Sequence, residues 1–302
     1  MALVDVASLA KVSCEQISMN NPSQQHFQHV FCPLDKLLPG SYGYLSTSNM
    51  SDTAIVFVHG FDGDPADTWT DFQTLMDTKA GIPPEWQNAD SFFFTYRSTK
   101  ASIDDSLDGL REFIDSLYPT LSHRVVELLP EHLQLPATYT KLILVGHSEG
   151  GAVIRALVAS LGSRWETGGV RSSILDSRVA LFAPAHFGFM PTSWLGALAS
   201  ITGIAGLMGI AISYSTPASE MRDKTALLQV NRITEKLFEK HPRVEAFAAH
   251  VLFGVDDHFV IRQYYLQDCR HTPEKGRNHQ TICKPSLSYL RPLSFVIGDC
   301  PK

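Results

Sequence analysis

Charged residues are scarce in this chain, and runs of them are absent. Only 19% of the 302 residues are charged, the formal net charge is −6, and no long basic stretch occurs. Because binding to a nucleic-acid backbone needs a basic patch, we expect no nucleic-acid partner. The hydrophobic fraction of 44% is too high for a disordered chain and is enough for one large domain or two smaller ones.

The cysteine pattern is also sparse. No C-x-x-C pair occurs, which argues against a structural zinc site, and we expect neither metal nor cofactor. Cys269 and Cys283 could bridge a loop, but reduced thiols are the expectation. Residues 1–16 lack a basic segment followed by a long apolar core, so they do not resemble a signal peptide and predict a cytoplasmic protein. The five cysteines are Cys14, Cys32, Cys269, Cys283 and Cys300.

Apolar strands and amphipathic helices alternate along the chain, without internal repeats. Turn signals such as PGSYG (39–43) allow an early antiparallel hairpin in the first fifty residues. Continuous apolar runs predict buried parallel strands, and therefore an α/β fold with helices on both faces of a mostly parallel sheet. The expected strands are 53–58, 91–96, 141–145, 177–183 and part of 244–254. The expected helices are 67–78, 103–118, 150–162 and 224–241.

The stretch LVGHSEGG places Ser148 between a predicted strand and a predicted helix. In this context G-x-S-x-G predicts a strained turn that exposes a nucleophilic hydroxyl at a helix N-terminus. Side chains at positions 146 and 150 would collide with the neighbouring strand or helix, which explains both glycines. Glu149 falls in the first helical turn, where the helix dipole favours a carboxylate.

Attack by Ser148 on an ester would create an oxyanion, which needs two hydrogen-bond donors. One is expected to be the backbone N–H of Glu149. The second should come from the loop after the strand at 53–58, where Gly60 lets the backbone turn toward the site and the N–H of Phe61 point inward.

A serine nucleophile also needs a base and an acid, and in folds where G-x-S-x-G joins a strand to a helix they follow the serine in the order Asp or Glu, then His. The fifth strand ends in VLFGVDDHFV, which offers Asp256 and Asp257, and both His271 and His279 come later. His147 is expected to face away from Ser148. With only 22 positions between 257 and 279, YYLQ (264–267) is expected to form at most a brief edge strand.

The segments FVHGFDGDPADTW, LVGHSEGG, LFAPAHFG, FGVDDHFV and NHQTICKP lie in order between residues 57 and 285. Together they resemble serine esterases and lipases of the α/β-hydrolase superfamily, and most nearly the GPI-inositol deacylases and the "serine active site containing" lipase-like proteins. The resemblance implies Asp257 as the acid, since G-x-x-D-x-x-V matches Gly254, Asp257 and Val260. It implies His279, in NHQTICKP, as the base.

No Asp, Glu, Lys or Arg occurs between Arg178 and Glu220, and residues 194–212 run for nineteen positions without a strongly polar side chain. That length suits a membrane span. A single span would separate Ser148 from His279, however, so we expect one domain over 1–302 with 186–222 inserted as a cap or lid. Plain core packing is an alternative. A lid could touch a membrane surface through 194–212, with peripheral association.

The predicted function is a serine carboxylic-ester hydrolase that acts on hydrophobic acyl esters through Ser148, His279 and Asp257. A small-molecule ester or lipid is the expected substrate. An acyltransferase or thioesterase would use the same residues, and a hydrolase-fold protein that only binds a hydrophobic ligand or a protein partner is a further alternative. The sequence does not predict the oligomeric state.

Overall fold

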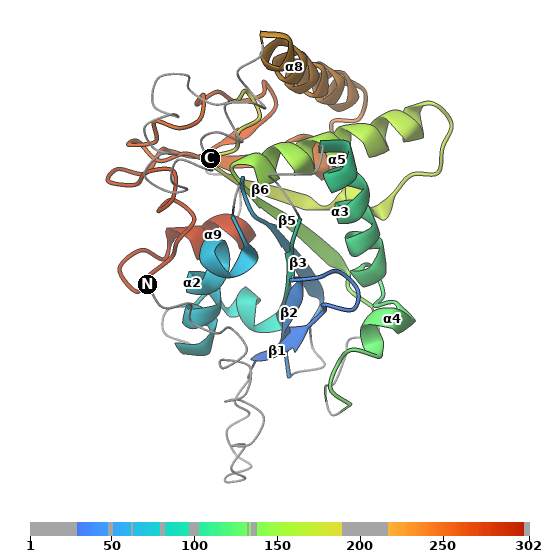
Figure 1. The fold of residues 1–302 in the computed structure, drawn as a ribbon, viewed down its shortest axis with the longest axis vertical. Helices are drawn as coiled ribbons and strands as arrows, with labels where there is room; N and C mark the ends of the chain where they lie inside the picture. Colours follow the sequence, from blue (N-terminus) through green and yellow to red (C-terminus); the bar gives the residue numbers. More distant parts are fainter. Residues whose placement is uncertain are drawn as a thin grey trace.

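An eight-stranded sheet forms the centre of the protein, which was analysed as a computed structural model (Figure 1). The structure describes residues 29–47, 51–61, 63–78, 82–96, 103–131, 133, 138–188 and 217–298. In spatial order the strands are β1 (His29–Pro33), β2 (Tyr42–Ser46), β4 (Ala89–Phe94), β3 (Thr53–Val58), β5 (Lys141–His147), β6 (Arg178–Phe182), β7 (His250–Leu252) and β8 (Cys269–Arg270).

Strand direction confirms the predicted α/β class. In spatial order, β4, β3, β5, β6, β7 and β8 run parallel to one another. The middle strands of this set are continuous buried apolar runs, as a sheet covered on both faces requires. The predicted early hairpin is present, because β1 pairs antiparallel with β2. The expected edge strand at 264–267 is wrong, since the outermost strand is β8, at Cys269–Arg270.

Helices cover both faces of the sheet, with α3 and α5 on one side and α2 and α9 on the other (Figure 1). Helix α2 contacts the central strand β3, and α9 contacts the central strand β5. The helices are α2 (Pro65–Thr78), α3 (Ile103–Leu117), α4 (His123–Val126), α5 (Glu149–Glu166), α8 (Pro217–Lys240) and α9 (Arg291–Ile297). The described residues also form short 3₁₀ helices, namely η1 (Pro84–Asn88), η2 (Ser173–Asp176) and η3 (Glu245–Phe247).

A cluster of aromatic rings anchors α2 to the sheet. The ring of Phe57 on β3 lies 5.0 Å from that of Trp69 and 5.2 Å from that of Phe72, both on α2. Burial of each such ring stabilises the fold by roughly 1.5–3 kcal/mol. This packing fixes the carboxyl end of β3, from which the loop at Gly60 starts.

The register of the sheet brings distant residues to one edge. Val58 at the end of β3 lies opposite Gly146 on β5, and His147 lies opposite Phe182 at the end of β6. Because the carboxyl ends of parallel strands share an edge, the loops that follow β3, β5, β6 and β7 meet there. Catalytic chemistry is therefore to be sought at this edge.

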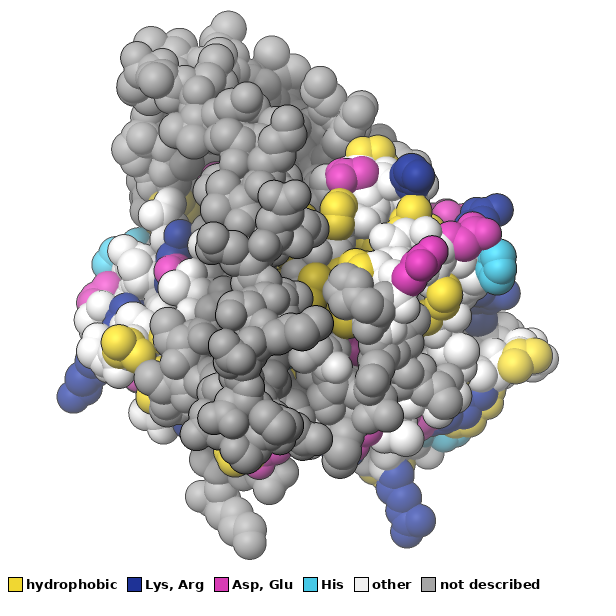
Figure 2. Space-filling view, turned by 90° about the horizontal axis from the view of Figure 1, so that it is seen from below, with side chains coloured by type: hydrophobic (Ala, Val, Ile, Leu, Met, Phe, Trp, Pro, Cys, Tyr) yellow, Lys and Arg dark blue, Asp and Glu magenta, His cyan; other side chains and the backbone are white. Residues whose placement is uncertain are grey.

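The predicted cap at 186–222 and the apolar stretch at 194–212 fall largely on residues 189–216, which lie outside the described residues. Among the helices that the structure does describe, none combines the length and apolar character needed to cross a bilayer. On the described part of the surface drawn in Figure 2, acidic and basic side chains are interspersed.

Candidate active site

Ser148 lies on a strained turn between β5 and α5. Its φ of 54° and ψ of −121° place a non-glycine residue in the sparsely populated left-handed half of conformational space. Such strain persists only where the surrounding structure holds it, and it is typical of functional sites. Its backbone N–H donates to the carbonyl of Phe182, and its carbonyl accepts from the N–H of Ala185, so β6 and its following loop hold the turn.

The predicted collisions at the two glycines of this turn are confirmed. A Cβ on Gly146 would lie 2.8 Å from the backbone of Gly151, and one on Gly150 would lie 2.4 Å from the carbonyl oxygens of Val58 and His59. Both distances are too short for real atoms, and backbone atoms cannot move aside cheaply. The tight approach of α5 to β5 therefore depends on glycine at position 146, and its approach to the end of β3 depends on glycine at position 150.

Three predicted side chains come together at this edge. Nε2 of His279 lies 2.9 Å from Oγ of Ser148, and Nδ1 of His279 lies 3.0 Å from Oδ2 of Asp257. All three residues are buried. Since the carboxylate can only accept, Nδ1 carries the proton and Nε2 is free to accept from the serine hydroxyl. The arrangement can therefore take a proton from Ser148.

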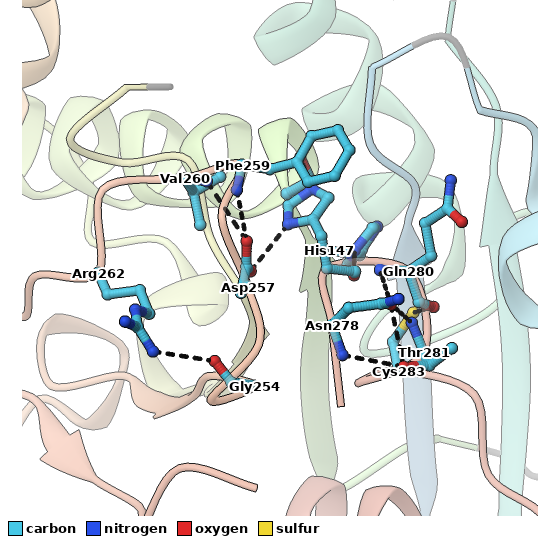
Figure 3. Close-up of polar contacts among 12 residues, drawn as sticks. His147, Gly254, Asp257, Phe259, Val260, Arg262, Asn278, Gln280, Thr281 and Cys283 are labelled. Carbon is cyan, nitrogen blue, oxygen red and sulfur yellow. Dashed lines mark hydrogen bonds and ion pairs between the residues drawn. The ribbon is translucent and has the colours of Figure 1, made fainter. Parts of the chain in front are cut away.

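Asp257 is held by more than His279. Its Oδ1 accepts hydrogen bonds from the backbone N–H groups of Phe259, at 2.9 Å, and Val260, at 3.4 Å (Figure 3). Burial alone would raise the pKa of Asp257, but the hydrogen bonds and the nearby imidazole outweigh it and keep the pKa below its usual value. The carboxylate is therefore ionised throughout the neutral range.

The competing candidates for acid and base lie elsewhere. Asp256 and His258 are exposed on the loop after β7. His271, directly after β8, lies beside His250 on β7, with 3.1 Å between Nε2 of His271 and Nδ1 of His250. Of these described candidates, Asp257 and His279 are the pair that the structure brings to Ser148.

The sequence pattern predicted that His147 faces away from Ser148. In the structure its side chain instead points toward the site. It is buried, its ring centroid lies 4.8 Å from that of His279, and its Nε2 lies 2.8 Å from the carbonyl oxygen of His279. The alternation of side chains along a strand ends at Ser148, where the backbone turns. Alternation therefore gave the wrong direction for His147.

The loop after β3 packs directly against the serine. A Cβ on Gly60 would lie only 2.8 Å from Cβ of Ser148. The carbonyl of Gly60 accepts from Nδ1 of His59 at 2.8 Å and from the N–H of Gly63 at 3.2 Å. Because the N–H of a trans peptide points opposite to its carbonyl, these two bonds direct the N–H of Phe61 away from His59.

Among the described residues, one group could supply metal ligands: His250, Cys269 and His271, whose candidate atoms lie within 4.8 Å of one another. Cys269 is disulfide-bonded, which corrects the expectation of a reduced thiol, whereas Cys32 and Cys283 are free. Arg178 donates to Nδ1 of His250 at 3.1 Å, and Arg291 donates to Nδ1 of His271 at 3.2 Å. A cation would meet two guanidinium groups there, so these residues do not fit a metal site.

Burial and the neighbouring arginines lower the pKa of His250 to about 3 and that of His271 to about 4. Both rings are therefore neutral at working pH and accept hydrogen bonds. This agrees with a structural network that ties the start of β6 to α9 through Arg178, whose Nε donates to the carbonyl of Val296 at 2.7 Å.

Several solved structures are similar to this chain at low identity. Carboxyl esterase 2 from the mycorrhizal fungus Tuber melanosporum is 15% identical, with a TM-score of 0.49 over 92% of this chain and 83% of that chain. Esterase B from Lactobacillus rhamnosis, inhibited by a tributyrin phosphonate, is 12% identical, with a TM-score of 0.46 over 83% and 74%. The 2-hydroxy-6-oxo-6-phenylhexa-2,4-dienoate hydrolase from Rhodococcus sp. strain RHA1 is 17% identical, with a TM-score of 0.42 over 85% and 94%.

No curated protein matches the chain. The family described as "Putative serine esterase (DUF676)" matches residues 48–263, which is more than half of the sequence. The matched range contains Ser148 and Asp257 and ends before His279.

Proposed function

Because the chain belongs to the family described as "Putative serine esterase (DUF676)" and has the α/β-hydrolase fold, we propose that it hydrolyses hydrophobic acyl esters through Ser148, His279 and Asp257. The observation that supports this most strongly is the unbroken hydrogen-bonded series from Oγ of Ser148 to Oδ2 of Asp257, at 2.9 and 3.0 Å. These are the distances at which a base can take a proton from a hydroxyl.

In the proposed mechanism Oγ of Ser148 attacks the ester carbonyl while Nε2 of His279 takes the hydroxyl proton. The tetrahedral intermediate collapses, the C–O bond to the alcohol breaks, and the imidazolium gives its proton to the departing alcohol. A water molecule then attacks the acyl-enzyme while His279 again accepts a proton. The bond to Oγ of Ser148 breaks, the imidazolium returns its proton to Oγ, and the acid is released. Asp257 holds the imidazole in the required tautomer and stabilises its positive charge.

Two backbone N–H groups are proposed to stabilise the oxyanion. The N–H of Glu149 is at the start of α5, where the helix dipole and the orientation of the first N–H groups favour negative charge. The N–H of Phe61 belongs to the peptide whose carbonyl is fixed by His59 and Gly63. Preorganised donors of this kind act without reorganisation during the reaction, which is the main source of their catalytic effect.

Substituting Gly60 by alanine is expected to lower kcat for ester hydrolysis by roughly 10²–10³-fold, the usual loss when one oxyanion donor is misplaced. The added Cβ would lie 2.8 Å from Cβ of Ser148 and 3.3 Å from Nδ1 of His147, so the loop must shift and carry the Phe61 N–H with it. Steady-state kinetics on a p-nitrophenyl ester measures the loss.

Gly109→Ala is the matched control for this substitution. A Cβ at Gly109, on α3, would meet its nearest neighbour, Phe94, at 3.7 Å, which is an ordinary contact that requires no movement. Activity should be unchanged. A Gly60→Ala enzyme with the wild-type kcat would contradict the proposed place of the Phe61 N–H.

The preference for a hydrophobic acyl group rests on the surroundings of the site. The ring of Phe259 stacks on His279 with centroids 5.0 Å apart, and Phe61 is only partly buried beside the loop that contacts Ser148. The apolar stretch at 194–212 follows β6 in the sequence, the strand next to β5, and is proposed to add an apolar wall. Such walls favour an alkyl chain over a charged or sugar group.

Hydrolysis of p-nitrophenyl esters from acetate to decanoate tests the function and the acyl preference together. The purified protein should turn over these esters, with kcat/KM rising from the acetate toward the longer chains. A faster reaction with acetate than with the longer esters would contradict the hydrophobic acyl preference. Complete absence of turnover across the series would contradict the esterase itself.

A further inference from the structure

His279 lies on a segment without regular secondary structure. Between β8 and α9 its neighbours form turns, so no sheet ladder or helix holds its backbone. Its side chain must nevertheless keep two contacts at once, one to Ser148 and one to Asp257. Something must therefore fix the main chain at this residue.

His147 makes that contact. Its Nε2 lies 2.8 Å from the carbonyl oxygen of His279. A carbonyl can only accept, so Nε2 of His147 carries a proton and donates it, which leaves Nδ1 unprotonated in the neutral ring. The hydrogen bond thus joins the end of β5, directly before the nucleophile, to the backbone of the base.

The donor is present at every working pH. Burial, followed by repulsion from His279, lowers the pKa of His147 to about 3. The imidazole therefore remains neutral in a single tautomer, set by its carbonyl partner. A group that does not titrate near neutrality suits a fixed anchor rather than a switch.

The ring of His147 also has little freedom to turn. A Cβ on Gly60 would come within 3.3 Å of its Nδ1, and the ring lies edge-on to Trp69 with centroids 6.4 Å apart. The imidazole of His279, which belongs to the residue that accepts this hydrogen bond, is stacked against the ring of Phe259 at an interplanar angle of 16°. His147 is therefore a rigid donor aimed at the carbonyl of His279, within a turn that Asn278 and Thr281 also hold by local hydrogen bonds.

We propose that His147 is a positioning residue, which fixes the backbone of His279 so that its imidazole spans Ser148 and Asp257. This inference rests on the proposed function. His147 does not touch the reacting atoms and acts only through His279. A misplacement of a reacting group by about 1 Å can lower a rate by roughly 10²-fold, which sets the scale of the expected effect.

The test compares His147→Phe, which keeps a ring and loses the donor, with His147→Gln, whose amide N–H can reach a similar position. His147→Phe should lower kcat for p-nitrophenyl ester hydrolysis roughly 10- to 100-fold and leave KM within about twofold, because ground-state binding does not use His279. His147→Gln should recover most of kcat. If the phenylalanine variant does not fold, His147→Met, which also lacks the donor, takes its place.

A double-mutant cycle separates positioning from a general loss of structure. In a His279→Ala background, His147→Phe should cause no further loss in the rate at which a fluorophosphonate labels Ser148, because the group it positions is gone. His250→Phe is the matched control, since His250 is also a buried neutral histidine and lies at the start of β7, two strands from β5. Its kcat per folded molecule should be unchanged.

Three results would overturn the inference: a wild-type kcat in His147→Phe, an equal loss in the His279→Ala background, or no recovery in His147→Gln. Its failure is distinguishable from failure of the proposed function. If Ser148→Ala removes hydrolysis while His147→Phe retains it, only the positioning role is wrong. If Ser148→Ala retains hydrolysis, the esterase mechanism itself is wrong.

Discussion

Replacing Ser148 by alanine is expected to lower kcat/KM for p-nitrophenyl ester hydrolysis by roughly 10⁴- to 10⁶-fold, the range seen when a serine nucleophile is removed. Without Oγ no acyl-enzyme can form, and the remaining donors at the turn give only residual catalysis. The protein should stay folded, since one hydrogen bond of 2.9 Å to His279 is lost at a net cost of about 1 kcal/mol.

Ser160→Ala is the matched control for this prediction. Ser160 is on the same helix, α5, but is exposed. Its substitution should leave both activity and thermal unfolding unchanged. Hydrolysis at the wild-type rate by a folded Ser148→Ala enzyme would show that another residue forms the acyl-enzyme.

Replacing Asp257 by asparagine is expected to lower kcat by roughly 10⁴-fold, which is the loss when the aspartate of a Ser-His-Asp triad is replaced by asparagine. The reason is that both carboxylate oxygens accept hydrogen bonds. Oδ2 accepts from Nδ1 of His279, and Oδ1 accepts from the backbone N–H of Phe259. An amide has only one oxygen, so its NH₂ group must face a donor on one side.

If the NH₂ group faces His279, the imidazole takes the other tautomer, with its proton on Nε2, and can no longer accept from Ser148. If the NH₂ group faces Phe259, two donors meet in a buried place and the loop shifts. Either orientation disables the base. Kinetics on the same ester measures the effect.

Asp256→Asn provides the control, because the neighbouring side chain is exposed. It should retain activity within about twofold, as surface substitutions usually do. The reverse pattern, with activity lost in Asp256→Asn and kept in Asp257→Asn, would move the role of the acid to Asp256.

The sequence predicted the central sheet well because its signal is local. The run TAIVFV matches β3 residue for residue, and the apolar runs after it match the cores of β4, β5 and β6. Burial on both faces demands apolar side chains at every position, so composition alone marks such strands. The turn at Ser148 was equally readable, because only glycine fits at 146 and 150.

The region after β7 was predicted less well, because its path depends on distant contacts. The outermost strand is two residues long and forms where Cys269 pairs with His250, not in the aromatic YYLQ segment. Short edge pairings of this kind leave no pattern in the sequence. The disulfide of Cys269 was likewise missed, since wide cysteine spacing does not identify a bond.

His147 shows a different limit. Side-chain alternation predicts that neighbouring residues on a strand face opposite sides of the sheet. This rule fails where β5 ends, because Ser148, the next residue, has a positive φ. The contact between His147 and the carbonyl of His279 joins residues 132 positions apart. Only the packed structure could bring them together.

Covalent labelling by a fluorophosphonate, followed by tryptic mass spectrometry, tests the central claim most directly. Trypsin releases residues 142–155, LILVGHSEGGAVIR, in which Ser148 is the single hydroxyl side chain. The account predicts one adduct per chain on this peptide, none in Ser148→Ala, and much slower labelling in His279→Ala. A folded protein that takes up no label, or takes it up on another peptide, would contradict it.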